Sequence, residues 1–345
     1  MEGERDKMKK WLIGLGSLFF ICCGIVVIIF ERTPAPGTAL IRYAFNREVP
    51  MKNVQQYEQQ KTKSTVVSNI TYPSKYGHNT MDLYYPKDVS PNEKLPIIVW
   101  VHGGAYIAGD KSFPKGFARY IVGDKRAAFV SINYELAPEL RYPGQVIQLE
   151  EAVREVKKLA ARYPFLNTEK WIIGGDSAGA QIAGQFTLIQ TNPAYAKEMQ
   201  REAILSSNDL LGFVSFCGPL DLPQMTTINW KRPVMALFAR TVGWDLTGEK
   251  NWKESDALKQ SSLVEHATKD FPASYVTDAT NLSFEEQGKA FVQTLQQKNV
   301  PVTSLFFNKD SDTAHEYQFS FETAEAQKNL QLFEAYFDDM TKNKK

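Results

Sequence analysis

Six consecutive apolar residues, from Pro96 to Val101, constrain the fold of this chain more than any other feature. A strand that is apolar on both faces must be covered on both, as happens in parallel sheets with helices on each side. Further short apolar runs that fit such strands are Ala127–Ile132, Trp171–Gly174, Gly212–Phe216, Ala273–Thr277 and Val302–Phe307. The chain is therefore expected to form a sheet buried between two layers of helices.

Two earlier segments, Val66–Tyr72 and Met81–Tyr85, alternate between apolar and polar residues, which is typical of half-buried antiparallel strands. Between later strands, Val146–Leu159 and Phe284–Gln297 carry apolar residues at helical spacing. The predicted fold class is therefore α/β, with a sheet that begins antiparallel, becomes mostly parallel and has helices on both faces.

One interval, about 219–266, does not follow this alternation. It contains Trp230, Trp244, Trp252 and the apolar stretch Val234–Phe238, and we expect a helical insertion over the sheet. Two interpretations stay open: a lid over a functional site, or an ordinary packed excursion.

A run of 20 residues without charge, Trp11–Phe30, lies near the N-terminus. As a helix it would extend about 30 Å, the thickness of the hydrocarbon core of a bilayer. We expect an uncleaved transmembrane anchor, because a cleaved signal peptide would have a shorter apolar region followed by small residues. A cleaved signal and a buried core helix are the alternatives. The basic residues that precede the run, and that favour a cytoplasmic N-terminus, are Arg5, Lys7, Lys9 and Lys10.

These features divide the chain into a cytoplasmic tail (1–10), a transmembrane anchor (11–30), a stalk (31–64) and a large folded domain (65–345), which includes the insertion. The stalk is expected because this segment is polar and irregular, with prolines and a Gln-rich stretch. The folded domain is expected to lie outside the cytoplasm, at the cell membrane.

Composition excludes several classes of protein. The chain has 40 Lys and Arg residues against 39 Asp and Glu, a net charge of +1, and 43% hydrophobic residues. A disordered chain would have fewer apolar residues, and a nucleic-acid-binding protein would normally be basic. With three cysteines, two of them inside the apolar run, a disulfide scaffold is also excluded.

The segment Trp171–Gly179 is an apolar strand that runs into G-x-S-x-G and then into the helical pattern Ala180–Thr187. A sharp strand-to-helix turn of this kind raises a nucleophile above the sheet in a strained conformation. Gly175 and Gly179 are needed because side chains there would collide with neighbouring backbone. Ser177 is therefore the candidate nucleophile, although a Gly-rich turn that merely caps a helix would give the same pattern.

Two glycines, Gly103 and Gly104, follow the apolar strand that ends at Val101. Their N–H groups, with that of Ala178, would bind the charge that develops on a carbonyl oxygen under attack. A phosphate-binding loop is the alternative, but no G-x-x-x-x-G-K pattern follows. We expect an oxyanion hole here, with His102 in a structural role.

A nucleophilic serine needs a base, and the sequence has four histidines, namely His78, His102, His266 and His315. His315 lies just beyond the last predicted strand, where the base stands in the chain order serine, acid, histidine. His315 is therefore the predicted base.

Four signatures appear in order along the chain: His102-Gly103-Gly104-Ala105; Tyr134-Glu135-Leu136-Ala137-Pro138-Glu139 with Tyr142-Pro143; Gly175-Asp176-Ser177-Ala178-Gly179; and His315-Glu316-Tyr317. Together they resemble the α/β-hydrolase carboxylesterases of the hormone-sensitive-lipase-like branch, over about residues 65–340. The resemblance implies an α/β-hydrolase fold and the hydrolysis of carboxylic esters without a metal or an organic cofactor.

The acid departs from this family pattern. Members usually carry G-x-x-D-P-L a few residues beyond the penultimate strand, whereas Asn281 or Leu282 falls at that position here. Neither can stabilise an imidazolium ion as a carboxylate does. Asp278, at the end of the strand, is the predicted acid. The alternatives are Glu285, which would also suit a helix N-terminus, Asp312, another acid or none.

The sequence therefore predicts a membrane-anchored serine esterase that acts through an acyl-enzyme on small-molecule, lipid or polysaccharide esters, including acetyl or short acyl esters. Trp230 and Trp244 of the insertion suit an apolar or sugar-like ester. A serine peptidase of the prolyl-oligopeptidase type is a second hypothesis, although it would usually carry a large extra domain. A non-catalytic binding protein on a degenerate hydrolase fold is the third, suggested by the displaced acid. No nucleic-acid partner is expected.

Overall fold

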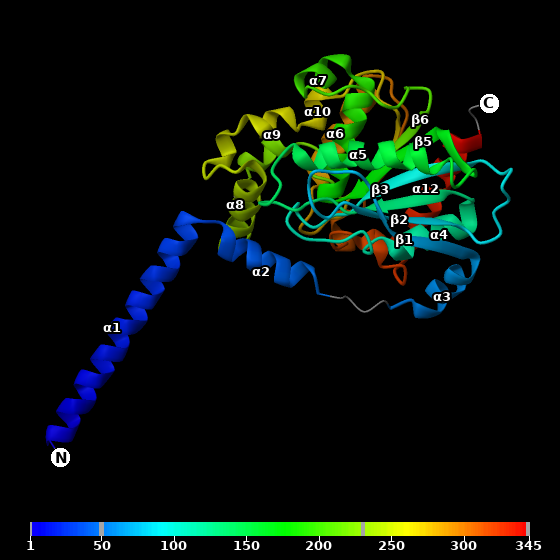
Figure 1. Cartoon of the computed structure of the whole chain (residues 1–345). Coiled ribbons are helices and arrows are strands. Elements are labelled where there is room, and N and C mark those ends of the chain that lie inside the picture. The colour runs from blue at the N-terminus through cyan, green and yellow to red at the C-terminus, as the bar shows by residue number, and fades with distance from the viewer. Residues whose placement is uncertain (1, 48–51, 229–231, 343–345) are drawn as a thin grey trace.

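In the computed structural model the chain forms a central eight-stranded sheet flanked by helices (Figure 1). The structure describes residues 2–47, 52–228 and 232–342. The strands are β1 (Ser64–Thr71), β2 (Thr80–Pro86), β3 (Leu95–Val101), β4 (Ala128–Ile132), β5 (Leu166–Asp176), β6 (Leu210–Phe216), β7 (Ala273–Thr277) and β8 (Val302–Leu305). Their order in the sheet is β1-β2-β4-β3-β5-β6-β7-β8.

The sheet begins antiparallel and continues parallel, as predicted. Strand β2 pairs antiparallel with both β1 and β4, and every following pair is parallel. Each strand coincides with a predicted segment. The largest difference is in β5, which starts at Leu166 rather than Trp171 because Leu166 already pairs with Leu95 across a register shift. The predicted α/β fold class is confirmed.

Helices cover both faces of the sheet and create two separate cores. Strand β3 shows why a continuous apolar run was needed: Ile97 and Val99 enter the larger core, whereas Ile98 and Trp100 enter the second. The larger core lies under α5 (Gly144–Leu159), α6 (Ala178–Thr191) and α11 (Glu285–Gln297), and the second lies under α4 (Lys115–Lys125) and α12 (Ala324–Lys342).

The interval between β6 and β7 is a helical insertion, as expected. Trp252 is buried against Gly243 of this insertion, Trp244 is half-buried, and Trp230 lies outside the described residues. The helices of the insertion are the 3-10 turn Leu222–Thr226, α8 (Pro233–Thr247), the 3-10 turn Trp252–Glu254, α9 (Asp256–Gln260) and α10 (Leu263–His266). The remaining helices of the domain are α7 (Pro193–Glu198) and the 3-10 turns Lys309–Ser311 and Tyr317–Phe319.

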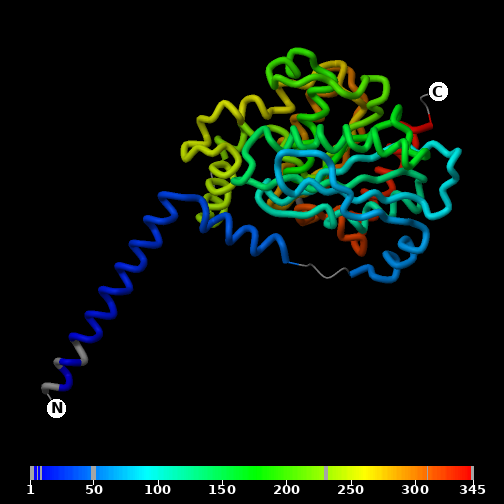
Figure 2. The backbone as a smooth tube through the Cα atoms, in the orientation of Figure 1, coloured from blue at the N-terminus to red at the C-terminus, as the bar shows by residue number. Residues whose placement is uncertain are grey.

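The first helix, α1 (Glu2–Arg32), extends away from the domain (Figure 2). Within its segment Lys10–Arg32, an 18-residue window has a mean hydropathy of 2.8 and is not buried against the rest of the protein. By length and composition this segment could cross a membrane, and a signal sequence would have the same properties.

The expected irregular stalk is wrong. Residues 31–64 contain two helices, α2 (Ala35–Phe45) and α3 (Val54–Lys63), and both pack on the domain. The Arg42 side chain of α2 donates to the carbonyl oxygens of Ile107 and Ala137 at 2.8 and 2.9 Å. Because these contacts are with residues distant in sequence, the polar, Pro- and Gln-rich composition of the segment did not reveal them.

Candidate active site

Ser177 occupies the sharp turn between β5 and α6. Its backbone has φ 48° and ψ −123°, a conformation that residues other than glycine rarely adopt. The Ser177 N–H donates to the carbonyl oxygen of Phe216 in the adjacent β6, at 2.7 Å. Gly179 packs so closely against the carbonyl oxygen of Val101 that a Cβ atom there would collide with it. The structure therefore has the strained elbow that the sequence predicts.

His315 lies in the loop after β8, and its Nε2 is 2.9 Å from Ser177 Oγ. This loop is fastened to the loop after β7 by reciprocal hydrogen bonds. The N–H of Thr280 donates to Thr313 Oγ1 at 2.9 Å, and the N–H of Thr313 donates to Thr280 Oγ1 at 3.0 Å. The two threonines fix the position of His315 relative to the end of β7.

The second imidazole nitrogen contacts a hydroxyl group, not a carboxylate. Nδ1 of His315 lies 2.8 Å from Ser283 Oγ, and Ser283 Oγ donates a short hydrogen bond to Asp278 Oδ1. The same Oδ1 accepts from the N–H groups of Ala279 at 2.7 Å and Phe284 at 3.3 Å. Asp278 thus stands one hydroxyl group away from His315, and Ser283 bridges them.

Sequence reasoning missed Ser283. The residue stands three positions before Glu286 and just ahead of α11, a spacing typical of a helix-capping serine. That more common role conceals the one seen here, where α11 begins without a side-chain cap at Phe284 and the hydroxyl bonds to His315 and Asp278. The displacement of the acid was the signal that an intermediary was needed.

Burial shifts the pKa values of Asp278 and His315. It raises the pKa of Asp278 to about 7, against the opposing effect of hydrogen bonds from Ser283 and the backbone. Oδ2 of Asp278 is buried and has no hydrogen-bond partner among the described residues. Burial also lowers the pKa of His315, which favours the neutral imidazole that a general base requires.

The charge of Asp278 decides the direction of this hydrogen-bond chain. An ionised carboxylate only accepts, so Ser283 must donate its single proton to Asp278 and accept from Nδ1–H of His315. Nε2 is then free to accept a proton from Ser177. If Asp278 is protonated it can donate to Ser283, Ser283 can donate to Nδ1, and the imidazole proton then rests on Nε2.

The alternative acids lie elsewhere. Glu285 forms an ion pair with Lys289 at 2.8 Å, and Asp312 accepts from the Asn281 side chain at 3.0 Å. Leu282 is 61% exposed. Of the predicted acids, the structure connects only Asp278 to His315.

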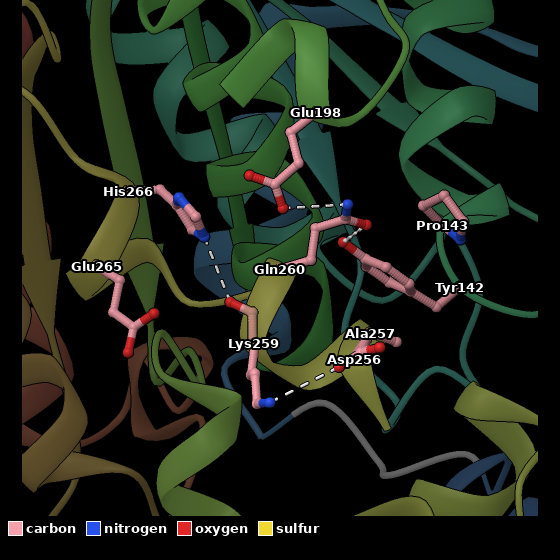
Figure 3. A pocket seen from close by; sticks show the side chains of 9 residues that line it. All are labelled: Tyr142, Pro143, Glu198, Asp256, Ala257, Lys259, Gln260, Glu265 and His266. Atoms are coloured by element: carbon pink, nitrogen blue, oxygen red, sulfur yellow. Dashed lines mark hydrogen bonds and ion pairs between the residues drawn. The ribbon is translucent and has the colours of Figure 1, made fainter. Parts of the chain in front are cut away.

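His266 belongs to a different site (Figure 3). It lines a cavity of about 460 Å³, where its Nε2 faces the carbonyl oxygen of Lys259 at 3.3 Å. Across the cavity, the Tyr142 hydroxyl donates to Gln260 at 3.1 Å. Ser177 is not among the residues that line this cavity.

The other two histidines have structural partners. Nδ1 of His78 lies 2.8 Å from a Glu135 carboxylate oxygen on the exposed surface. His102 is fully buried and stacks on Tyr134, with ring centroids 4.4 Å apart. Only His315 is brought to Ser177.

The expected oxyanion hole needs a correction. The N–H of Gly103 donates to Asp176 Oδ2 at 2.7 Å, so in this structure it is not available to a substrate. A Cβ atom at Gly103 would lie only 2.6 Å from the same oxygen. Glycine is therefore needed at this position because the Asp176 side chain approaches so closely. Within the described part of the chain, the N–H groups of Gly104, Ala105 and Ala178 donate to no protein acceptor. These three are the candidate donors.

Two carboxyl groups lie beside Ser177 and His315. Asp176 is buried and accepts from Trp100 Nε1 at 2.6 Å, and Glu316 Oε1 lies 3.9 Å from His315 Nε2. Burial raises the pKa of both carboxyl groups, and the charge on Asp176 raises that of Glu316 further. These effects favour the protonated form of Glu316, which can donate a hydrogen bond to Asp176.

Residues 98–318 match the model of a protein family described by the α/β-hydrolase fold. Esterase LipI of Mycobacterium tuberculosis is 26% identical over 225 residues, which are 64% of this chain and 66% of that protein. An acetyl esterase of Salmonella schwarzengrund is 34% identical over 120 residues, 35% of this chain and 36% of the relative. The first curated relatives are matched over between 33% and 66% of their length.

Solved structures have the same fold. Esterase B from Lactobacillus rhamnosis superposes with a TM-score of 0.71 at 17% identity, covering 90% of this chain and 96% of that one. An esterase from the archaeon Pyrobaculum calidifontis gives a TM-score of 0.62 at 17% identity, covering 88% and 97%. The relatives named here are esterases. Since the family match begins in β3 and continues beyond His315, it spans the whole candidate site, and the chain belongs to the family of the α/β-hydrolase fold.

Proposed function

We propose that this chain is a serine carboxylesterase in which Ser177 is the nucleophile and His315 the general base. The observation that carries the proposal is the 2.9 Å contact between Ser177 Oγ and His315 Nε2 on a strained elbow. Ser283 and Asp278 act as positioning residues behind the imidazole.

In the first half of the reaction, Ser177 Oγ attacks the ester carbonyl carbon while its proton passes to Nε2 of His315. The carbonyl oxygen becomes negatively charged and would be held by N–H groups of Gly104, Ala105 and Ala178. Collapse of this intermediate breaks the bond to the alcohol, which leaves with the proton from Nε2. The product on the enzyme is an acyl ester of Ser177.

In the second half, water attacks the acyl-enzyme and gives its proton to His315 Nε2. The proton returns to Ser177 as the acid product leaves. Throughout, Nδ1–H of His315 donates to Ser283, whose hydroxyl donates to the Asp278 carboxylate. This chain stabilises the imidazolium ion that forms transiently.

Acetyl or other short acyl esters are the proposed substrates, on the analogy of the relative named an acetyl esterase. The leaving alcohol could belong to a small molecule, a lipid or a polysaccharide. The helical insertion between β6 and β7 would act as a lid.

The test is hydrolysis of p-nitrophenyl acetate by the full-length protein in detergent micelles. Ser177→Ala should lower kcat by at least about 10³-fold, because the covalent step is lost. Ser68→Ala is the matched control, since Ser68 is an exposed residue of the edge strand β1, and it should keep full activity. A fluorophosphonate probe should label Ser177 in the control and not in Ser177→Ala. Acylation of another residue, with activity retained in Ser177→Ala, would refute the assignment.

We also propose that α1 anchors the enzyme in the cell membrane as an uncleaved single span, with residues 1–10 in the cytoplasm and the catalytic domain outside. The uncharged run and the preceding basic residues support this topology. Protease added to intact cells should release the domain. A mature protein that lacks its first residues would identify the segment as a cleaved signal instead.

A further inference from the structure

Helix α2 has an unusual distribution of side chains. Its exposed positions carry no charged or polar hydrogen-bonding groups other than the hydroxyl of Tyr43: they are Ala35, Ala39, Leu40, Tyr43, Ala44 and Phe45. Leu40 and Tyr43 are 58% and 66% exposed. A surface helix of a soluble protein normally presents its polar side to solvent.

The polar side chains of α2 point inward instead. Thr38 is buried and donates to the Asp245 carboxylate of α8. Arg42 donates to Ile107 and Ala137 and forms an ion pair with Glu139. Polar bonds therefore hold α2 on the domain, and its apolar side is left outward.

The apolar surface continues onto α8. Phe238 lies against Phe45, with ring centroids 6.0 Å apart. Val234 stands one turn before Phe238, so it is on the same side of α8, and it is 70% exposed. We call Leu40, Tyr43, Phe45, Val234 and Phe238 the apolar face of α2 and α8.

The position of this face relative to α1 indicates what covers it. Only Thr33 and Pro34 separate α1 from α2, so two residues of backbone keep the start of α2 within about 10 Å of the end of α1. Figure 1 shows that α1 points away from the domain, whereas α2 changes direction after α1 and runs along the edge of the domain. Glu31, near the end of α1, pairs with Arg240 and Lys250 of the insertion region at 3.0 and 3.2 Å.

We propose that the apolar face of α2 and α8 lies in the interfacial region of the bilayer in which α1 is anchored. The proposal rests on the proposed anchor, because a spanning α1 would place α2 at the membrane surface. Leu40 and Phe45 enter the boundary between headgroups and acyl chains, as the apolar side of an interfacial helix does.

The remaining chemistry of the helix suits this position. Tyrosine is favoured at the membrane interface, where its ring is in an apolar layer and its hydroxyl is hydrated. Arg47, just beyond α2, places its guanidinium 4.4 Å from the centre of the Tyr43 ring, and Arg32 ends α1. Both arginines are exposed and can bind lipid phosphate groups.

The experiment uses full-length protein with Cys22→Ser and Cys23→Ser, reconstituted into vesicles of phosphatidylcholine and phosphatidylglycerol at 3:1. A single cysteine is introduced as Ala39→Cys on the apolar side of α2 or, as the matched control, as Ala194→Cys on α7. Both alanines are exposed helical residues, and Figure 1 shows α7 on the opposite side of the domain from α2. Each cysteine is labelled with an environment-sensitive nitrobenzoxadiazole dye, and spin-labelled phosphatidylcholine is the quencher.

At position 39 we expect blue-shifted emission and quenching at least about twofold stronger than at position 194. Adding Leu40→Glu to the Ala39→Cys protein should move its emission back towards that of an aqueous dye. Equal quenching at the two positions would overturn the proposal, and so would a signal that Leu40→Glu leaves unchanged. A blue shift without lipid quenching, lost when the protein is diluted in the bilayer, would identify a second copy of the chain as the covering partner.

Hydrolysis of water-soluble p-nitrophenyl acetate is measured on the same samples. This activity tests the esterase independently of the location of α2, so failure of one proposal is distinguishable from failure of the other.

Discussion

Ser177 and Asp278 both stand at the ends of central strands, but they reach His315 in different ways. Ser177 contacts the imidazole directly, and its position is imposed by the backbone of its own turn and of the adjacent strands. Asp278 is connected to the imidazole only through Ser283. The position of Ser283 relative to His315 depends on two loops joined by Thr280 and Thr313.

From this difference we expect the two halves of the site to tolerate change unequally. The nucleophile must meet both the base and the substrate, so its geometry leaves little freedom. The acid only has to set the tautomer and stabilise the charge of the imidazole, and a hydroxyl group can transmit both effects over one additional hydrogen bond. The predictions that follow test this division between a direct half and a relayed half.

Within the relayed half, the largest effect is expected for Asp278→Asn. The amide oxygen of Asn can still accept from Ser283 and from the two backbone N–H groups, but the negative charge that stabilises the imidazolium ion is lost. We expect kcat to fall by about 10²- to 10³-fold, below the roughly 10⁴-fold of a directly bonded acid. Glu285→Gln is the control, and it should cost less than about tenfold, because Glu285 only pairs with Lys289 at the start of α11. Steady-state kinetics measures kcat for both variants, and circular dichroism checks that each remains folded. A larger loss in Glu285→Gln than in Asp278→Asn would identify Glu285 as the acid.

The next effect is the pH dependence. The raised pKa of Asp278, about 7, means that the carboxylate forms only above that pH, whereas the lowered pKa of His315 keeps the imidazole neutral well below it. The acid limb of kcat/KM should therefore follow Asp278, with a midpoint near pH 7 and a loss of about tenfold per pH unit below it. In Asp278→Asn this limb should disappear from the neutral range. A wild-type profile that stays flat down to pH 5 would show that the charge of Asp278 does not control the tautomer of His315.

A smaller loss is expected for Ser283→Ala, about 10- to 50-fold in kcat with KM little changed, because water can replace part of the relay. Ser283→Thr, which restores a hydroxyl group, should recover most of the activity. The acid limb near pH 7 should weaken in the alanine variant, which a purely structural serine would not cause. If Ser283→Ala behaves like wild type in rate and pH profile, Asp278 does not act through this hydroxyl.

The smallest effect concerns the direct half of the site. Burial and the charge of Asp176 raise the pKa of Glu316 and favour its protonated form, which can donate to Asp176, and the amide of Gln can donate in the same way. Glu316→Gln should therefore stay within about threefold of wild-type kcat at pH 7. Glu316→Ala removes the donor from the Asp176 carboxylate and should cost more. Equal losses for the two variants would show that the hydrogen bond to Asp176 is not what Glu316 contributes.

The direct half could be predicted from the sequence because its constraints are local. G-x-S-x-G after an apolar strand leaves few backbone conformations for Ser177, and both glycines are required by atoms within or next to the same turn. Chain order then singled out His315 among four histidines. The relayed half could not be completed, because Ser283 has the spacing of a helix cap and its partner His315 is 32 positions away along the chain.

Two other expectations failed for the same reason. Gly103 was expected to donate to an oxyanion, but the side chain of Asp176, 73 positions away, accepts its N–H. Residues 31–64 were expected to form a stalk, but Arg42 and Thr38 hold α2 against residues far along the chain. The composition of a segment does not predict which surface of the folded protein it will pack against.

The sequence by itself determined the fold class, the strands and the candidates for nucleophile and base, because hydrophobic periodicity and turn chemistry act over a few residues. Only the tertiary structure decided that Ser283 stands between Asp278 and His315, that Asp176 accepts the N–H of Gly103 and that α2 turns its apolar side outward. Each of these depends on hydrogen bonds between loops or helices that meet only when the sheet has formed. A buried polar group must find a partner wherever the fold supplies one, and that choice belongs to the assembled molecule.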